Sequence, residues 1–592
     1  MMHEEHEEQK LPKIWSERIE KALKDERHEH KRITALRQYV SGRYSDDMRS
    51  QYAVRVNVVM ATLQGLMPHV YAQAPDVAVT AVPGVTGTVD PMVKRFAGTL
   101  EGVLSRQLKD ARLRKLGKRC VRAAMTTGLS WAKASYQRDI YRDPHIERRI
   151  QDAQEELRRL EHLMDECEDD TKEEHEAKME MLRDLVRSLE EKVEVVRQEG
   201  LVLDYVRDED IIVSPAVATL EDYIFAPWIA HRIWMTQDQA AETFDLDSDD
   251  LAKADKWRKP GDEDTDSTDR SQWVAVLEIW DSTFKTVYTL IQGMDKWARD
   301  PFSPTKTGER WYPFFLLAFN WVDGERRPIS DVELWADLQD EYNDTRTKYR
   351  EHRKKAVPAR VGAAGSLSPE DARKLANPDL NEYVLADLQT GQRASDVVGI
   401  IPYPPVDPGL YDTSQIRSDL EMVSGLQDAA RGTVARAKTA TEAEILQMGL
   451  VSRTTERQAS VEEWIEEMAQ YCAEILLQNM TKEQVMRIVG PDAVWPELDK
   501  EDIFNMVNIE VRAGTTGRPD QRREQQTWMQ LLPLIQQTIQ QIAQAEAQGM
   551  ESLANAGRYL LQETLRRFDE TIDIDEVMPK QAAPMQLVEG VQ

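Results

Sequence analysis

The chain has 592 residues and is 41% hydrophobic, so it contains enough apolar material for several packed domains. Its 105 acidic residues exceed its 76 Lys and Arg residues and give a formal net charge of −29. This excess argues against a protein that wraps DNA on a basic surface, although it does not exclude one that encloses DNA without adhering to it. Three cysteines make no disulfide framework, and no apolar run reaches about 18 residues, so we expect a cytoplasmic protein that neither spans a membrane nor is secreted.

Residues 1–45 are predicted to form a charged helical arm with few apolar positions. We interpret its histidines as part of a solvated tail and not as metal ligands, because a flexible arm does not preorganise a site: His3, His6, His28 and His30. A mixed α/β region, 46–329, follows. Its predicted helices are 52–67, which Pro68 ends, 91–109 and 111–127. Its predicted strands are rich in β-branched and aromatic residues and are 75–82, 129–136, 211–215, 228–235, 273–280, 286–291 and 314–319.

The segment 146–196 has the periodicity of an antiparallel helical hairpin. The first apolar seam is Ile146, Ile150, Ala153, Leu157, Leu160, Met164 and Cys167. A polar turn, 168–175, separates it from a second seam, which is Met179, Leu182, Val186, Leu189, Val193 and Val196. We therefore expect a projecting hairpin without a catalytic role.

Two acidic runs, 245–250 and 262–269, lie between the predicted strands. Asp262, Asp264 and Asp266 have the spacing that begins an EF-hand loop. Ser267 occupies the position of the turn glycine, however, and Trp273 occupies that of the bidentate glutamate. We therefore interpret the run as a solvated linker and predict no metal site.

A strong helix is predicted at 331–356, beginning at a capping box of Ser330 and Glu333 and ending before Pro358. Acidic residues occupy its first half and basic residues its second half. The helix macrodipole favours this order, so the charge pattern needs no functional explanation. The candidate site residues at its basic end are Lys348, Arg350, Arg353, Lys354 and Lys355. The loop-rich unit 358–408 separates this helix from a second one at 411–424, so the ends of the two helices must lie side by side.

A basic loop, 425–438, precedes the longest predicted helix, 441–480. The loop contains one acid, Asp428, and three cations, which are Arg431, Arg436 and Lys438. A helix of this length spans roughly 60 Å, and its middle, 452–460, is polar all round with no core face. Such a rod either bridges two domains of one chain or crosses between the subunits of a ring.

The last part of the chain is predicted to contain a strand at 507–512, helices within 516–570 and a disordered acidic tail at 571–592. The sequence contains no phosphate-binding G-x-x-x-x-G-K-[ST] loop and no G-x-S-x-G, H-E-x-x-H or paired C-x-x-C motif. We therefore expect no enzymatic activity and no cofactor.

Several segments in this order resemble the portal proteins of tailed bacteriophages: 55–79, 210–236, 278–281 with 311–321, 328–360 and 423–445. The most specific parts are the helix that carries Gln339 and Asn343 and the junction from Gly432 to Glu442. The resemblance covers most of 50–570 as an order of elements, and none of its motifs is catalytic. The hairpin at 146–196 is an elaboration that the family does not predict.

The resemblance implies an α+β subunit, mainly helical, that assembles into a ring of twelve at one vertex of the virion capsid. Its parts would be a wing at 46–329, stem helices at 330–357 and 409–424, a clip at 358–408, a tunnel loop at 425–438, a long kinked helix with a return to the wing at 439–515 and a helical crown at 516–570. Double-stranded DNA would pass through the ring.

The implied protein partners are terminase, neck, adaptor or tail proteins, and the major capsid and scaffold proteins. Arg431, Arg436 and Lys438 would then lie near DNA or pair with acids of a neighbouring subunit. Two other classes remain open, namely another virion structural or scaffold protein and a coiled-coil assembly factor without a DNA channel.

Overall fold

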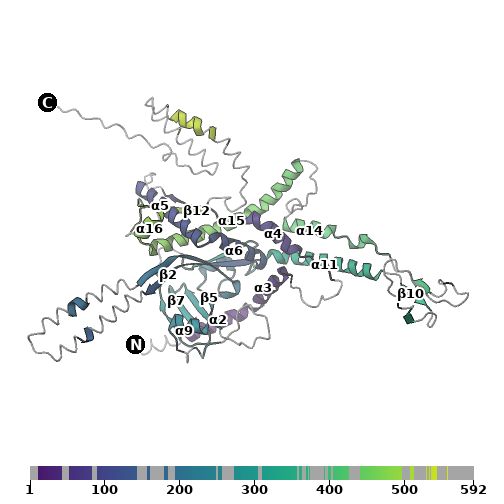
Figure 1. Cartoon of the computed structure of the whole chain (residues 1–592), viewed down its shortest axis with the longest axis horizontal. Coiled ribbons are helices and arrows are strands. Elements are labelled where there is room, and N and C mark those ends of the chain that lie inside the picture. The colour runs from purple at the N-terminus through teal and green to yellow at the C-terminus, as the bar shows by residue number, and fades with distance from the viewer. Residues whose placement is uncertain are drawn as a thin grey trace, which may run out of the picture.

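The computed structural model contains both helix and sheet, 57% helical and 20% strand, which confirms the predicted α+β class (Figure 1). It describes residues 11–42, 53–82, 90–142, 194–247, 273–304, 310–356, 359–362, 398–401, 405–425, 440–491, 493–496 and 507–511. It also describes shorter pieces at 157–159, 179–183, 251, 253–255, 308, 369–370, 373, 393, 504, 529, 532–533, 535–542, 544 and 557.

Two antiparallel sheets form the middle of the body. The three-stranded sheet has the order β3-β2-β9, and its strands are β2 (Leu129–Arg142), β3 (Glu194–Val206) and β9 (Phe314–Ala318). The five-stranded sheet has its strands in sequence order, and these are β4 (Ile211–Val213), β5 (Trp228–Thr236), β6 (Trp273–Asp281), β7 (Thr286–Ile291) and β8 (Trp297–Phe302). Short helical segments connect or flank these strands: η3 (Asp208–Asp210), η4 (Leu220–Phe225) and α9 (Gln237–Phe244).

A layer of helices covers the outer face of the three-stranded sheet. Its members share one apolar core and are α4 (Val58–Val70), α5 (Pro91–Asp110), α6 (Leu113–Thr127), the second half of α15 (Ala440–Asn479) and α16 (Lys482–Val489). In β2, Ala132 and Ala134 face this core, whereas Leu129 and Trp131 face the space between the two sheets. This alternation is the period-two pattern of a strand buried on both faces.

The N-terminal helices α2 (Leu11–Asp25) and α3 (Arg27–Val40) pack on the body, so the prediction of a solvated arm at 1–45 is wrong for 11–40. Trp15, Ile19 and Ala22 are buried against the outer face of the five-stranded sheet. The Trp15 ring meets Trp228 edge-on at 5.7 Å between centroids. The few apolar positions of the arm are therefore concentrated on one buried stripe.

Other boundaries also differ from the sequence prediction. Helix α4 begins at Val58, where the Asn57 side chain accepts a hydrogen bond from the Met60 amide, and it continues beyond Pro68 to Val70. Residue 196, assigned above to a helical seam, belongs to β3 and pairs with Ile140 of β2. Most of the predicted hairpin, including Cys167, lies outside the described residues, as do 262–269 and 571–592. Strand β1 (Val77–Ala81) pairs antiparallel with β12 (Val507–Val511).

A buried ion pair joins the two sheets. Lys133 of β2 donates to Glu278 of β6 at 2.5 Å, and the Trp280 indole donates to the other Glu278 oxygen at 2.7 Å. Burial would raise the pKa of Glu278, but the Lys133 ammonium outweighs it and holds this pKa below its ordinary value. Nearby, burial and then the Lys133 charge lower the pKa of His231 to about 4. His231 is therefore neutral between the sheets.

We expect the protein to lose stability as the pH falls from about 6.5 to about 4 because of His231. In this window the unfolded chain binds a proton at His231 that the folded chain does not, so the free energy of unfolding falls by up to about 3 kcal/mol. Glu278 contributes only at lower pH, because its stabilisation is present above its unfolded pKa and is lost through its lowered folded pKa.

Chemical denaturation across this pH range checks the prediction. His231→Gln should remove most of this pH dependence, whereas His28→Gln, on the exposed side of α3, should leave it unchanged. An unaltered pH dependence in His231→Gln would assign the acid sensitivity to other groups.

Candidate functional site

Two helices, α11 (Asp331–Lys355) and α14 (Ser414–Ser424), lie side by side and project from the body (Figure 1). The capping box predicted for the first is present: the Ser330 hydroxyl accepts from the Glu333 amide, and the Glu333 carboxylate accepts from the Ser330 amide. The second was predicted to begin at 411 but begins at Ser414. Residues 408–411 form a separate short helix, η5 (Pro408–Tyr411). At the far end, β10 (Ala359–Gly362) pairs antiparallel with β11 (Val398–Ile401).

Aromatic and cationic side chains join the two helices along their length. The Tyr342 hydroxyl of α11 accepts hydrogen bonds from Arg346 at 3.0 Å and from Arg417 of α14 at 3.2 Å. Burial would raise the pKa of Tyr342, but the hydrogen bond and charge of Arg417 outweigh it and lower this pKa. Further out, Tyr411 lies 5.3 Å from the Tyr349 ring, between centroids, and its hydroxyl is 3.0 Å from His352 Nδ1. The helix pair is therefore held by specific contacts.

The candidate cations of α11 lie on several sides of the helix. Lys348 is exposed and pairs with Asp344 at 2.6 Å, and Arg350 donates to the Ala53 carbonyl at 3.3 Å. The Arg353 guanidinium lies 5.9 Å from the centre of the Tyr349 ring, and Lys354 is exposed. Lys355 is the last residue of α11. These five residues give the outer end of the helix a net positive charge, and the four whose side chains the structure describes have different surroundings.

The tunnel-loop residues Arg431, Arg436 and Lys438 lie outside the described residues. The structure places the two ends of their segment. Gly425 ends α14 with φ of 72°, a conformation that favours glycine, and α15 begins at Ala440. The predicted cap of Thr441 and Glu444 is likewise outside the described side chains.

The polar middle of α15, for which the sequence predicts no core face, packs on the N-terminal end of α11 through polar side chains. The two guanidinium nitrogens Nη1 and Nη2 of Arg457 each donate to an oxygen of Asp331 at 2.7 Å. Asp331 is only 1% exposed and also accepts from the Asn320 amide at 3.0 Å. The Gln458 side chain donates to the His69 carbonyl at 2.6 Å. The buried face of this segment is polar, which is why a search for apolar periodicity missed it.

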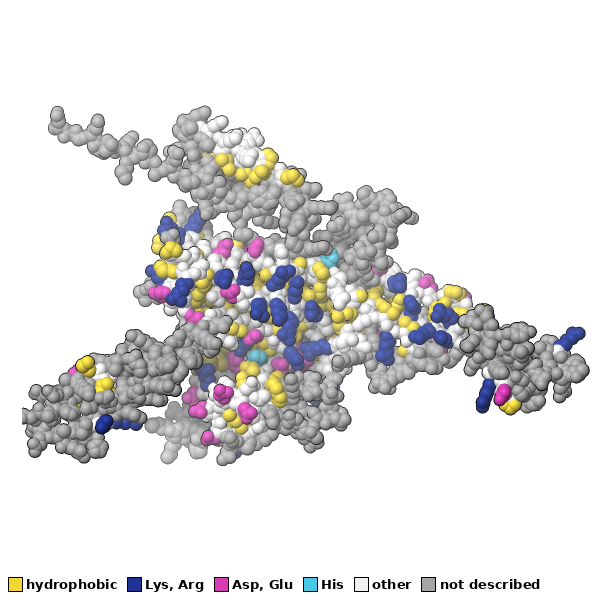
Figure 2. Space-filling model, in the orientation of Figure 1, with side chains coloured by type: hydrophobic (Ala, Val, Ile, Leu, Met, Phe, Trp, Pro, Cys, Tyr) yellow, Lys and Arg dark blue, Asp and Glu magenta, His cyan; other side chains and the backbone are white. Residues whose placement is uncertain are grey.

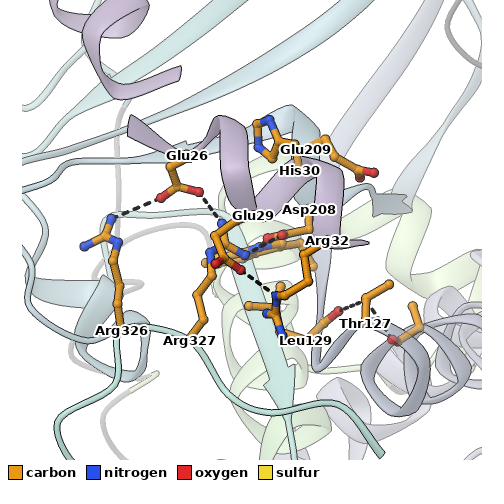
Figure 3. A network of polar contacts seen from close by, with 12 residues as sticks. Glu26, Glu29, His30, Arg32, Thr127, Leu129, Asp208, Glu209, Arg326 and Arg327 are labelled. Atoms are coloured by element: carbon orange, nitrogen blue, oxygen red, sulfur yellow. Dashed lines mark hydrogen bonds and ion pairs between the residues drawn. The ribbon is translucent and has the colours of Figure 1, made fainter. Parts of the chain in front are cut away.

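A second polar network fastens α3 to the body (Figure 3). Arg327 lies between Glu26 and Asp208 and donates to both, and Asp208 also accepts from the Trp131 indole at 3.1 Å. Arg32 of α3 donates to Glu333, the capping residue of α11. Burial lowers the pKa of His30 in this network. The network joins the N-terminal helices, both sheets and the root of α11.

One basic surface of the described structure was not predicted from the sequence. It lies on the outer side of α6, in the middle of the face shown in Figure 2. We call it the α6 basic face, and its residues are Arg112, Arg114, Lys115, Lys118 and Arg122. The chain contains no Asp or Glu from 111 to 138, although its net charge is −29. This local absence of acids was the signal that could have identified the surface.

The described residues contain no group of three or more His, Cys, Asp or Glu side chains arranged to hold a metal ion. Among the described helices, none is long and apolar enough to cross a membrane. No protein-family model matches the chain, and a search of curated proteins finds no match to it.

Proposed function

We propose that the protein is a portal-type subunit of a tailed bacteriophage, which forms a ring through which double-stranded DNA is packaged, retained and ejected. In this proposal the protein has no enzymatic activity of its own. The ring, of twelve subunits, occupies one vertex of the virion capsid and is assembled in the host cytoplasm. It contacts the major capsid and scaffold proteins, binds terminase during packaging and later binds neck, adaptor or tail proteins.

The observation that carries the proposal is the projecting pair α11 and α14, with the β10–β11 unit at its far end. In chain order, this pair is followed, after residues 426–439, by the 40-residue helix α15. A stem, a clip, a tunnel loop and a long helix in this order are what the sequence resemblance implies. A globular enzyme has no evident need for a two-helix projection with a small sheet at its tip.

The joint between the two helices supports the stem assignment. Arg417 and Arg346 both donate to Tyr342. Nearer the outer end of α11, the ring of Tyr411 contacts the ring of Tyr349. These contacts join α11 to η5 and α14 at more than one level along the projection. A docking site for a packaging motor or an adaptor protein would require fixed geometry.

Electron microscopy of the purified full-length chain in negative stain tests the proposal. We expect rings with a central hole wide enough for double-stranded DNA and projections on one side. A monomer or a filament without a hole would favour another virion structural protein or a coiled-coil assembly factor. Sedimentation velocity at several concentrations would separate a stable ring from a weak association.

Replacing Arg431, Arg436 and Lys438 together with alanine is expected to leave ring assembly intact and to reduce DNA packaging or retention. Phosphate contacts by exposed cations are salt-dependent, so the deficit should grow with ionic strength. DNA retained in assembled particles is the measurement, with a triple alanine variant of the exposed residues Lys13, Lys21 and Lys24 as the matched control. If ring assembly itself weakens, the loop cations pair with a neighbouring subunit.

A further inference from the structure

Within the described part of the chain, no ion pair involves a residue of the α6 basic face. Among the residues that the structure describes, no carboxylate pairs with Arg114, Lys115, Lys118 or Arg122, and the one contact of Arg114 is with the Ala72 carbonyl at 3.3 Å. The opposite side of α6 is buried in the helical core. The cations are therefore free to meet the acidic surface of another molecule.

A pocket of about 600 Å³ adjoins this face, between α4 and α6. Met60, Leu63 and Met67 provide its apolar wall, and Lys118 and Arg122 line it from α6. Tyr71 also lines the pocket, and its buried hydroxyl has no hydrogen-bond partner among the described residues. The combination fits an apolar side chain accompanied by carboxylates better than it fits DNA, because phosphates gain nothing from an apolar pocket.

The same chain has a projection that carries exposed aromatic rings and acidic side chains, and we call it the η4 knob. Phe225 and Phe284 are 83% and 72% exposed, and the exposed acids Glu221 and Asp222 lie beside Phe225 in η4. The Ser282 hydroxyl donates to the Ala226 carbonyl at 3.0 Å, which joins the two loops that carry the rings. Exposed rings in a fixed position are characteristic of interface residues.

The knob and the pocket lie on opposite faces of the three-stranded sheet. Tyr223 anchors η4 beneath the sheet, where its ring meets Trp131 edge-on at 5.0 Å between centroids. Helix α6 covers the other face, where it packs against Ala132 and Ala134. One copy therefore presents its knob on one side and its pocket on the other. A contact between a knob and a pocket is head-to-tail, and repetition of such a contact closes a ring when the rotation permits.

We propose that the η4 knob of each subunit inserts Phe225 into the α4–α6 pocket of its neighbour, with Glu221 and Asp222 against Lys118 and Arg122. This inference rests on the proposed ring and identifies the surfaces that join its subunits. Both surfaces are present on every copy, and their charges are complementary. The net charge of −29 would otherwise oppose self-association, so a local basic surface facing a local acidic one offsets that repulsion.

Charge exchange in the full-length chain tests the inference. The pocket variant is Lys118→Glu with Arg122→Glu, and the knob variant is Glu221→Lys with Asp222→Lys. Each alone should reduce the association constant by about tenfold or more, because it places like charges in contact. The chain that carries all four substitutions should regain ring formation, since the charges are again complementary. Phe225→Ser should weaken assembly without changing charge.

The matched control is Lys21→Glu with Lys24→Glu, on the exposed side of α2, which makes the same change in net charge. Oligomeric state is measured by sedimentation velocity and negative-stain images, and circular dichroism confirms folding. If the unmodified chain makes no rings, the proposed function itself fails. If it makes rings and both charge variants do so as well, only the present inference is overturned. The inference is also overturned if the pocket variant keeps its rings but loses DNA, which would assign the α6 basic face to nucleic acid.

Discussion

Replacing Arg457 with alanine is expected to lower the free energy of unfolding by about 3–5 kcal/mol, because it leaves the buried Asp331 carboxylate without its charged partner. Among the residues that the structure describes, only the Asn320 amide would remain as a side-chain donor to Asp331. The loss also removes the link between the polar middle of α15 and the root of α11. Chemical denaturation of the full-length chain measures it.

A double replacement separates the cost of an unpaired charge from the net value of the pair. Arg457→Met with Asp331→Asn should recover most of the loss, since a buried ion pair often contributes little more than a neutral substitute. Arg353→Ala, at the exposed end of α11, is the control and should leave the unfolding transition unchanged. A loss in Arg457→Ala as small as in this control would mean that water replaces the guanidinium at Asp331.

Replacing Arg327 with alanine is expected to have a comparable effect, about 3–5 kcal/mol, because it leaves the Glu26 and Asp208 carboxylates facing each other in a buried site. Burial would lower the pKa of Arg327, but the two carboxylates outweigh it and raise this pKa, so the guanidinium is permanently charged there. Repulsion between the acids should also release α2 and α3 from the body.

Denaturation and limited proteolysis together check this prediction. Cleavage within α2 and α3 should become faster in Arg327→Ala, whereas Lys24→Ala, which loses only an exposed pair with Glu20, should behave as the parent. Arg327→Lys should be intermediate, because an ammonium retains the charge but not the planar fork that contacts both acids. If Arg327→Ala lowers the free energy of unfolding without faster cleavage of α2 and α3, the buried apolar residues around Trp15 are sufficient to keep these helices on the body.

Features determined by neighbouring residues were predicted well. The Ser330–Glu333 cap, the strand at 286–291 and the length of α15 each depend on a local pattern, and the structure confirms them. Strand β8 (Trp297–Phe302) was missed because it contains charges and a proline, which is tolerated on the outermost strand of the sheet. The start of β3 was misassigned because Val193 and Val196, three residues apart, also fit a helical seam.

The errors in the candidate site have a different origin. Arg32 and Glu333 are 301 residues apart in sequence, and Arg457 and Asp331 are 126 apart. A charged side chain with a distant partner has the same local pattern as a solvated one. For this reason the arm was predicted to be a solvated tail, and the middle of α15 was predicted to have no core face. The α6 basic face could have been predicted, because the absence of acids from 111 to 138 is visible in the sequence.

The pairing of β1 with β12 can form only late in the synthesis of the chain, because its two strands are far apart in sequence. Thr80 and Asn508, which are partners in this ladder, are 428 residues apart. At a synthesis rate of about 5–20 residues per second, β1 waits roughly 20–90 s for its partner to leave the ribosome. Until then its edge is open to other strands, a hazard for aggregation. A chain can complete this ladder only after β12 has been translated, and under the proposed function the subunits that enter the ring would be those that have done so.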